Sequence, residues 1–112
     1  MKNYHSLRNN REFQMVYNEG NSKANRYLVL YYRKNDLEYN RLGISVSKKV
    51  GNSVPRNRIK RLIKENYRLL EKDIKENNSL VILWKKSVDK EEADFYKIKE
   101  DMKQIFEKAE II

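Results

Sequence analysis

Three stretches of the chain carry the hydrophobic pattern of β-strands. Residues 26–33 (RYLVLYYR) are rich in β-branched and aromatic side chains. In residues 40–47 (NRLGISVS) apolar and polar positions alternate, as in a strand with one buried face. The short connection between these two stretches predicts an antiparallel hairpin. Residues 79–84 (SLVILW) are apolar without alternation, which predicts a strand covered on both faces. Residues 21–25 are polar and fit either a turn or a short edge strand.

Two helices are expected near the ends of the chain. After a loose arm of residues 1–8, Asn9 and Glu12 resemble a capping box, and Gly20 ends the helix that follows. Its apolar residues share one face: Phe13, Val16 and Tyr17. Asp89 is expected to cap the last helix, whose apolar positions follow a helical period: Phe95, Ile98, Met102, Ile105, Phe106 and Ala109.

The stretch of residues 41–68 concentrates the charge of the chain. It holds nine basic residues and one acid, and the whole chain has a net charge of +9. A helix that begins in this stretch, from Pro55 to about Leu70, places apolar residues around Ile59 and a row of cations on the opposite face. Proline suits the first turn of a helix, where its missing N–H would be unpaired. Such local basicity is typical of a surface that binds a polyanion.

The order of these elements is helix, two or three strands, basic helix, strand, helix. This order predicts an α+β layered domain. No repeat, linker or low-complexity tract divides residues 1–112, so a single domain is expected.

The chain lacks the usual patterns of protein-side catalysis. It has no cysteine and a single histidine, His5, which falls in the expected arm. The acids are scattered, and neither a metal-binding motif nor a phosphate-binding glycine loop occurs. No apolar run is long enough to cross a bilayer, and no signal-peptide region is present. These features favour a binding role in a reducing cytosol over an enzyme with its own active site.

Aromatic residues supply a second clue to the ligand. Eight tyrosines exceed what a small core can bury with every hydroxyl paired. Phe13, Tyr17, Tyr27 and Tyr31 are expected to form a platform beside the basic surface, although core packing also accounts for Phe13 and Tyr17. A base stacked on an aromatic ring contributes about 1–3 kcal/mol. Cations beside a stacking platform are typical of proteins that bind single-stranded RNA.

The same residues resemble a known family. The strand RLGISVSKK, the Gly-Asn turn and RNRIKR within residues 41–61 resemble the signature of the bacterial ribonuclease P protein subunit. The resemblance extends upstream to FQMVYNEG at residues 13–20 and SKANR at residues 22–26. It is weaker over residues 70–112, where spacing matches but few residues are diagnostic.

The resemblance implies a fold and an activity. The fold is an αβββαβα sandwich of the ribosomal protein S5 domain 2-like class, with a left-handed βαβ crossover through the basic helix and a short strand at residues 21–25. The implied partners are a large catalytic RNA and precursor tRNA, in the cytoplasm, with no role for DNA or a membrane. That RNA, with Mg²⁺, would remove the 5′ leader of precursor tRNA by endonucleolytic hydrolysis. The protein itself would then carry no catalytic residue, metal ligand or cofactor.

The resemblance also assigns the binding residues. The paired lysines and the basic helix are expected to contact the catalytic RNA: Lys48, Lys49, Arg56, Asn57, Arg58, Lys60, Arg61, Lys64 and Arg68. A cleft between the first helix and the sheet is expected to bind the leader: Phe13, Tyr17, Ser22 and Tyr31. Two alternatives remain open: a general RNA-binding or ribosome-associated module, and a DNA-binding repressor that uses residues 55–70 as its recognition helix.

Overall fold

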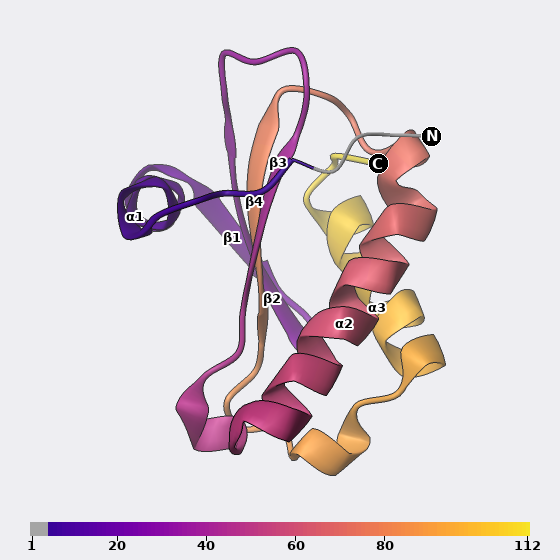
Figure 1. Cartoon of the computed structure of the whole chain (residues 1–112). Coiled ribbons are helices and arrows are strands. Elements are labelled where there is room, and N and C mark those ends of the chain that lie inside the picture. The colour runs from indigo at the N-terminus through magenta and orange to yellow at the C-terminus, as the bar shows by residue number, and fades with distance from the viewer. Residues whose placement is uncertain (1–4) are drawn as a thin grey trace.

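A four-stranded mixed sheet lies between one helix on one face and two helices on the other (Figure 1). The computed structural model describes residues 5–112. The helices and strands follow in the order α1 (Asn10–Glu19), β1 (Asn21–Ala24), β2 (Leu28–Lys34), β3 (Arg41–Ser45), α2 (Ser53–Leu70), β4 (Asn78–Trp84) and α3 (Phe95–Lys108). This order confirms the αβββαβα prediction, and residues 21–24 form the short edge strand.

The predicted hairpin between β2 and β3 is wrong, because β4 lies between them. The strand order is β1-β2-β4-β3, with β2 antiparallel and β3 parallel to β4. The connection at residues 35–40 therefore spans two strand spacings, about 10 Å. β4 is the most apolar strand, and its Leu80, Val81 and Ile82 are fully buried. A central position covers both of its faces, as its unalternating pattern predicted, and the parallel β3–β4 pair confirms the crossover through α2.

The two faces of the sheet carry cores of unequal size. The larger core fills the space beneath α2 and α3, where Leu30, Ile63 and Phe106 are fully buried. The smaller cluster lies beneath α1 and centres on Leu7, Val16 and Val81. One short helix cannot cover a whole sheet face. Part of the α1 face is consequently left open to solvent, and that opening positions the site described below.

The N-terminal arm is docked rather than loose over its described part. The Leu42 N–H donates to the His5 carbonyl at 2.8 Å, and the Leu7 N–H donates to the Leu42 carbonyl at 3.0 Å. Ser6 thereby forms a parallel bridge with the edge of β3, and Leu7 is buried under α1. The prediction failed because the arm is held by a strand edge that lies far along the chain. Residues 1–4 of the predicted arm lie outside the described residues.

The Asn9 cap and the glycine end of α1 follow the sequence prediction, but the Glu12 carboxylate accepts the N–H of Arg8, one residue before the Asn9 N–H that a capping box uses. The Asn9 side chain accepts the Glu12 N–H at 3.0 Å, as a helix cap does. At the other end, a Cβ on Gly20 would lie 2.5 Å from the Tyr32 carbonyl oxygen of β2. Glycine therefore lets the end of α1 approach the sheet closely.

The basic helix α2 has the predicted apolar stripe. Ile59, Ile63, Asn66 and Leu70 are buried, and Tyr67, which the helical wheel did not assign to the stripe, joins them. Pro55 lies in the first turn, as expected.

The predicted cap of the last helix is wrong. Asp89 caps only a 3-10 turn (Lys90–Glu92). Ala93 is then buried in an extended conformation, which interrupts the helix. α3 starts after Asp94, whose carboxylate accepts the Tyr96 and Lys97 N–H groups at 3.0 Å each.

A buried carboxylate ties α3 to the start of β2. Asp101 accepts the N–H of Arg26 at 3.1 Å and those of Tyr27 and Leu28 at 3.0 Å each. Two of these donors lie in the turn that leads from β1 into β2, and the third, Leu28, is the first residue of β2. The carboxylate therefore fixes that turn against the main core.

We predict that Asp101→Asn lowers the free energy of unfolding by about 2 kcal/mol, because an amide turns one acceptor oxygen into a donor facing backbone N–H groups. Urea unfolding monitored by circular dichroism measures the difference. Glu107→Gln makes the same chemical change at an exposed position of α3 and serves as the control. Equal stability of the two variants would contradict the role given to Asp101.

Candidate nucleic-acid interface

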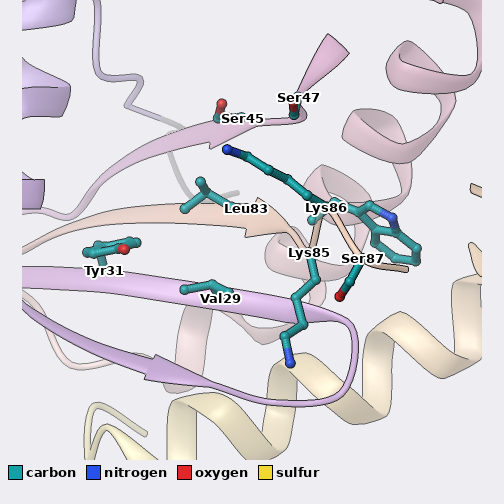
Figure 2. A pocket seen from close by; sticks show the side chains of 9 residues that line it. Val29, Tyr31, Ser45, Ser47, Leu83, Lys85, Lys86 and Ser87 are labelled. Atoms are coloured by element: carbon teal, nitrogen blue, oxygen red, sulfur yellow. The ribbon is translucent and has the colours of Figure 1, made fainter. Parts of the chain in front are cut away.

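The part of the sheet that α1 leaves uncovered forms a groove of about 650 Å³. Its floor is apolar and comes from Val29 and Tyr31 of β2 and Leu83 of β4 (Figure 2). The remaining lining residues come from the ends of β3 and β4 and from the loops that follow them: Ser45, Ser47, Trp84, Lys85, Lys86 and Ser87. Figure 2 shows the Lys86 side chain reaching across the strands toward Ser45. The groove thus combines an apolar floor with hydroxyl and ammonium groups.

A row of aromatic rings borders this groove. The rings of Tyr17 and Tyr31 meet edge to face, with centroids 5.0 Å apart, and Phe13 follows at 6.4 Å from Tyr17. All three are half-buried. Phe13 packs directly over Gly43 of β3, where a Cβ would lie 2.5 Å from the ring. Glycine at this position is what allows the ring to approach the strand so closely.

Ser22 joins the same face of the sheet. It lies opposite Tyr31 in the β1–β2 pairing, and directly opposed residues of an antiparallel pair point to the same side. The structure therefore brings together all four residues predicted for the leader cleft: Phe13, Tyr17, Ser22 and Tyr31.

Tyr27 does not belong to the aromatic row, contrary to the sequence prediction. It is buried in the main core, where its ring stacks on Trp84 with centroids 5.8 Å apart. β2 begins only at Leu28, so Tyr27 lies in the preceding turn and does not follow the alternation of the strand. The carboxylate of Asp101 fixes that turn.

The surroundings of Tyr17 shift the pKa of its hydroxyl. Burial raises the pKa of Tyr17, and the neighbouring Tyr31 raises it further, while a hydrogen bond with Ser45 opposes the shift. The phenol therefore stays uncharged at neutral pH and beyond. An uncharged ring does not repel an anionic ligand.

The basic surface lies on α2 and on the turn before it. Lys48 and Lys49 are exposed in a 3-10 turn (Lys48–Val50). On α2, one group of residues is exposed: Asn57, Arg58, Arg61 and Arg68. Another is half-buried: Arg56, Lys60 and Lys64. From residue 57 to residue 68 this row extends over about 16 Å of helix, long enough to meet several phosphates.

Two arginines of this row also have structural partners. The Arg56 Nε donates to the carbonyls of Gly51 and Asn52, at 3.0 and 3.3 Å. An Arg58 guanidinium nitrogen donates to the Ala93 carbonyl at 3.1 Å. These bonds explain how two cations are held in the first turns of a helix, an end that the dipole makes unfavourable for positive charge. Each guanidinium keeps further donors for a ligand.

Lys85 and Lys86 were missed by the sequence analysis. The available signal was their position directly after the most apolar strand of the sheet, because residues at the end of a central strand emerge beside any groove on that sheet. The link between groove and basic surface was also missed: Ser45 and Ser47 line the groove, and Lys48 follows at once.

An ion pair joins the arm, α1 and β3. The Arg41 guanidinium meets the Glu12 carboxylate at 2.5 and 3.3 Å and also donates to the Ser6 carbonyl at 2.6 Å. The Arg8 backbone N–H holds the pKa of Glu12 below its usual value, Arg41 adds to this effect, and partial burial opposes it. Glu12 precedes Phe13, so this ion pair holds the start of the aromatic row against β3.

Neither a metal site nor a membrane span is found in the described part of the chain. Within residues 5–112, no three histidine, cysteine or acidic side chains come close enough to hold a metal ion. No helix in the same range is long and apolar enough to cross a membrane.

Comparison with known proteins gives a consistent result. The sequence model of the family described as Ribonuclease P matches residues 1–110. A ribonuclease P protein component of Clostridium botulinum is 50% identical over 106 residues, covering 94% of each chain. One from Alkaliphilus metalliredigens is 52% identical over 83 residues, covering 74% of this chain and 75% of the relative.

Solved structures point to the same family. The Staphylococcus aureus RNase P protein matches with a TM-score of 0.86 at 32% identity, over 97% of this chain and 98% of that one. The Thermotoga maritima protein matches with a TM-score of 0.84 at 33% identity, over 93% of this chain and 96% of that one.

We predict that Glu12→Gln lowers the free energy of unfolding at pH 7 by about 1–2 kcal/mol, because the charged hydrogen bonds to Arg41 and Arg8 are weakened. A lowered pKa means that this contribution is present above the ordinary value of 4.5 and is lost as the pH falls below it. Urea unfolding at pH 7 and at pH 3 measures the difference.

The matched control is Glu38→Gln, which removes the same charge from an exposed loop. If the difference in the free energy of unfolding between wild type and Glu12→Gln stays constant from pH 7 to pH 3, the role given to the ion pair is contradicted.

Proposed function

The chain belongs to the ribonuclease P protein family, and on that basis we propose that it binds the catalytic RNA of ribonuclease P and the 5′ leader of precursor tRNA. The observation that carries this proposal is the pairing of two surfaces in one small domain. One is the cationic row on α2 and its preceding turn. The other is the aromatic-lined groove on the opposite side of the sheet (Figures 1 and 2).

The α2 surface suits a folded RNA. Its cations lie along a rigid helix whose apolar side is anchored in the main core. A helix fixed in this way presents its charges at set distances, so it can match phosphates that are themselves held in a folded RNA. Lysine and arginine release counterions from RNA, which gives strong and salt-dependent binding. We assign Lys48, Lys49 and the α2 cations to the catalytic RNA.

The groove suits a single strand. Stacking on Tyr31 and its neighbours does not depend on base identity, which fits a leader whose sequence varies between precursor tRNAs. Lys85 and Lys86 are placed to meet the phosphates of a strand lying on the apolar floor. The hydroxyls of Ser45 and Ser47 are available to bases and 2′-hydroxyls.

Hydrolysis is assigned to the RNA partner and its Mg²⁺. The groove residues supply stacking, hydroxyl and ammonium groups, and Tyr17 stays neutral. These groups bind and orient a strand but do not form the acid–base pair that a protein nuclease needs. The protein would then act by holding the leader beside the catalytic RNA.

The geometry favours RNA over duplex DNA as the ligand of α2. A DNA-reading helix-turn-helix places one helix directly before the recognition helix. Here α2 follows β3 and a three-residue 3-10 turn. A general RNA-binding module would use the same two surfaces, and the reconstitution below separates it from a processing subunit.

We expect the protein to restore cleavage of precursor tRNA by a bacterial ribonuclease P RNA at a low Mg²⁺ concentration, because it adds positive charge and leader contacts that the RNA lacks. Gel analysis of the released leader measures the rate. The RNA alone at the same Mg²⁺ concentration is the control. Absence of stimulation would reject the processing role and leave the general RNA-binding module.

Substitutions should separate the two surfaces. Lys48→Ala should reduce the slope of log affinity for the catalytic RNA against log salt by about 0.7–0.9 for one lost phosphate contact. Tyr31→Ala should leave that slope unchanged and lower the preference for precursor over mature tRNA by about 1–3 kcal/mol for one lost stacked base. Filter binding over a range of salt concentrations measures both.

Tyr31→Phe keeps the ring and should keep the preference for precursor tRNA. Thermal melts show whether each variant is folded at the assay temperature. If Tyr31→Ala lowers only the melting temperature and leaves the preference intact, the aromatic row is core packing and not a binding surface.

A further inference from the structure

A second pocket, of about 380 Å³, lies at the edge of β3. It is lined by the arm, α1, β3 and α2 through Ser6, Leu7, Phe13, Leu42, Gly43, Ile44, Lys60, Arg61 and Lys64. Its volume falls within the range of sites that bind small organic ligands. The pocket shares Phe13 with the aromatic row and three residues with the cationic row, so it lies where the two surfaces meet.

The edge of β3 is only partly covered. In a parallel strand both backbone groups of alternate residues point toward the same neighbour. Those of Leu42 bond to His5 and Leu7 of the arm. Those of Ile44, two residues later, point to the same side, where the arm has already turned away into α1. Among the described residues none hydrogen-bonds to them.

The pocket therefore offers three kinds of contact. Ile44 presents one backbone donor and one acceptor side by side. Phe13 presents an apolar ring, and Lys60 and Arg61 present positive charge. Among the described residues that line the pocket, none is acidic. The Arg61 guanidinium lies 4.0 Å from Glu65, and both of these side chains are largely solvated, so this pair leaves the charge of Arg61 available.

The chemistry of these contacts matches a nucleotide better than a polypeptide. The Watson–Crick edge of every base carries an adjacent hydrogen-bond donor and acceptor, and every base has a flat face for stacking. The phosphate supplies the negative charge that the cations require. A second copy of this chain, which could pair with the open edge of β3, would bring its own charge of +9.

We propose that this pocket binds one unpaired nucleotide of RNA, with its base paired to the backbone of Ile44 and its phosphate held by Lys60 and Arg61. The inference rests on the proposed function and extends it, because the nucleotide would lie between the leader groove and the surface for the catalytic RNA. Its base is read by backbone groups, whereas the groove holds bases by stacking.

Backbone amide hydrogen exchange tests this directly. In the free, ¹⁵N-labelled full-length protein, the Ile44 amide should exchange quickly, because it lies on an open edge. A saturating five-nucleotide single-stranded RNA should shift its resonance and slow its exchange by about tenfold. The Leu42 amide, already bonded to His5, should change little and serves as the internal control.

The amides of Val29 and Tyr31 report on the leader groove in the same spectra. If they respond to the RNA while Ile44 does not, the pocket proposal is wrong and the proposed function stands. If neither region responds, the proposed function fails as well. Protection of Ile44 without RNA that increases with protein concentration would also overturn the proposal, because it would indicate pairing between two copies of the chain.

Exchange in the assembled holoenzyme, followed by mass spectrometry, identifies the source of the nucleotide. Protection around Ile44 that requires precursor tRNA assigns it to the leader. Protection that forms with the catalytic RNA alone assigns it to that RNA. Ile44 that remains unprotected in both states would overturn the proposal.

A charge-matched pair of variants tests the phosphate contact. Lys60→Gln should weaken binding of the five-nucleotide RNA and reduce the salt slope by about 0.7. Lys103→Gln removes the same charge from the exposed side of α3 and should leave both unchanged. Equal effects of the two substitutions would show that only the net charge matters, which contradicts a defined phosphate site.

Discussion

β4 is buried on both of its faces, and this burial determines the order of the sheet and the cover that each face needs. A strand with apolar side chains on both sides must be central, so β4 lies between β2 and β3, and the sheet needs cover on both faces. α2 and α3 cover one face fully. On the other face α1 is too short to complete the cover, and the uncovered floor beside Tyr31 is the groove. The groove is thus a consequence of how the core is closed.

The same arrangement separates two surfaces of different chemistry. The cations of α2 lie over the main core, where the helix is held rigidly by Ile59 and Ile63. The aromatic row lies on the other side of the sheet, held in place by Gly43 beneath Phe13 and by the ion pair of Glu12 with Arg41. β3 is the element common to both surfaces. Under the proposed function, a protein of 112 residues would contact two RNA segments at once without a second domain.

Local patterns in the sequence predicted most of the elements but not their pairing. The cap at Asn9, the stripe around Ile59 and the apolar β4 follow from short-range periodicity. Strand order does not follow from short-range periodicity, because it depends on which strands pair with one another across long stretches of the chain. The docked arm, the turn fixed by Asp101 and the buried Tyr27 also escaped prediction, since each depends on a partner far along the chain. For the site, the sequence predicted the kinds of residue involved. The groove and its lysines could be located only once the order of the strands in the sheet was known.

In the proposed function, the groove binds the leader while α2 binds the catalytic RNA. The most direct test is the affinity of the holoenzyme for precursor tRNAs with leaders of increasing length, measured with and without this protein. The account predicts that the protein adds nothing for mature tRNA, and that its contribution rises with each leader nucleotide until the groove is filled. An equal contribution to mature tRNA and to every precursor would contradict it.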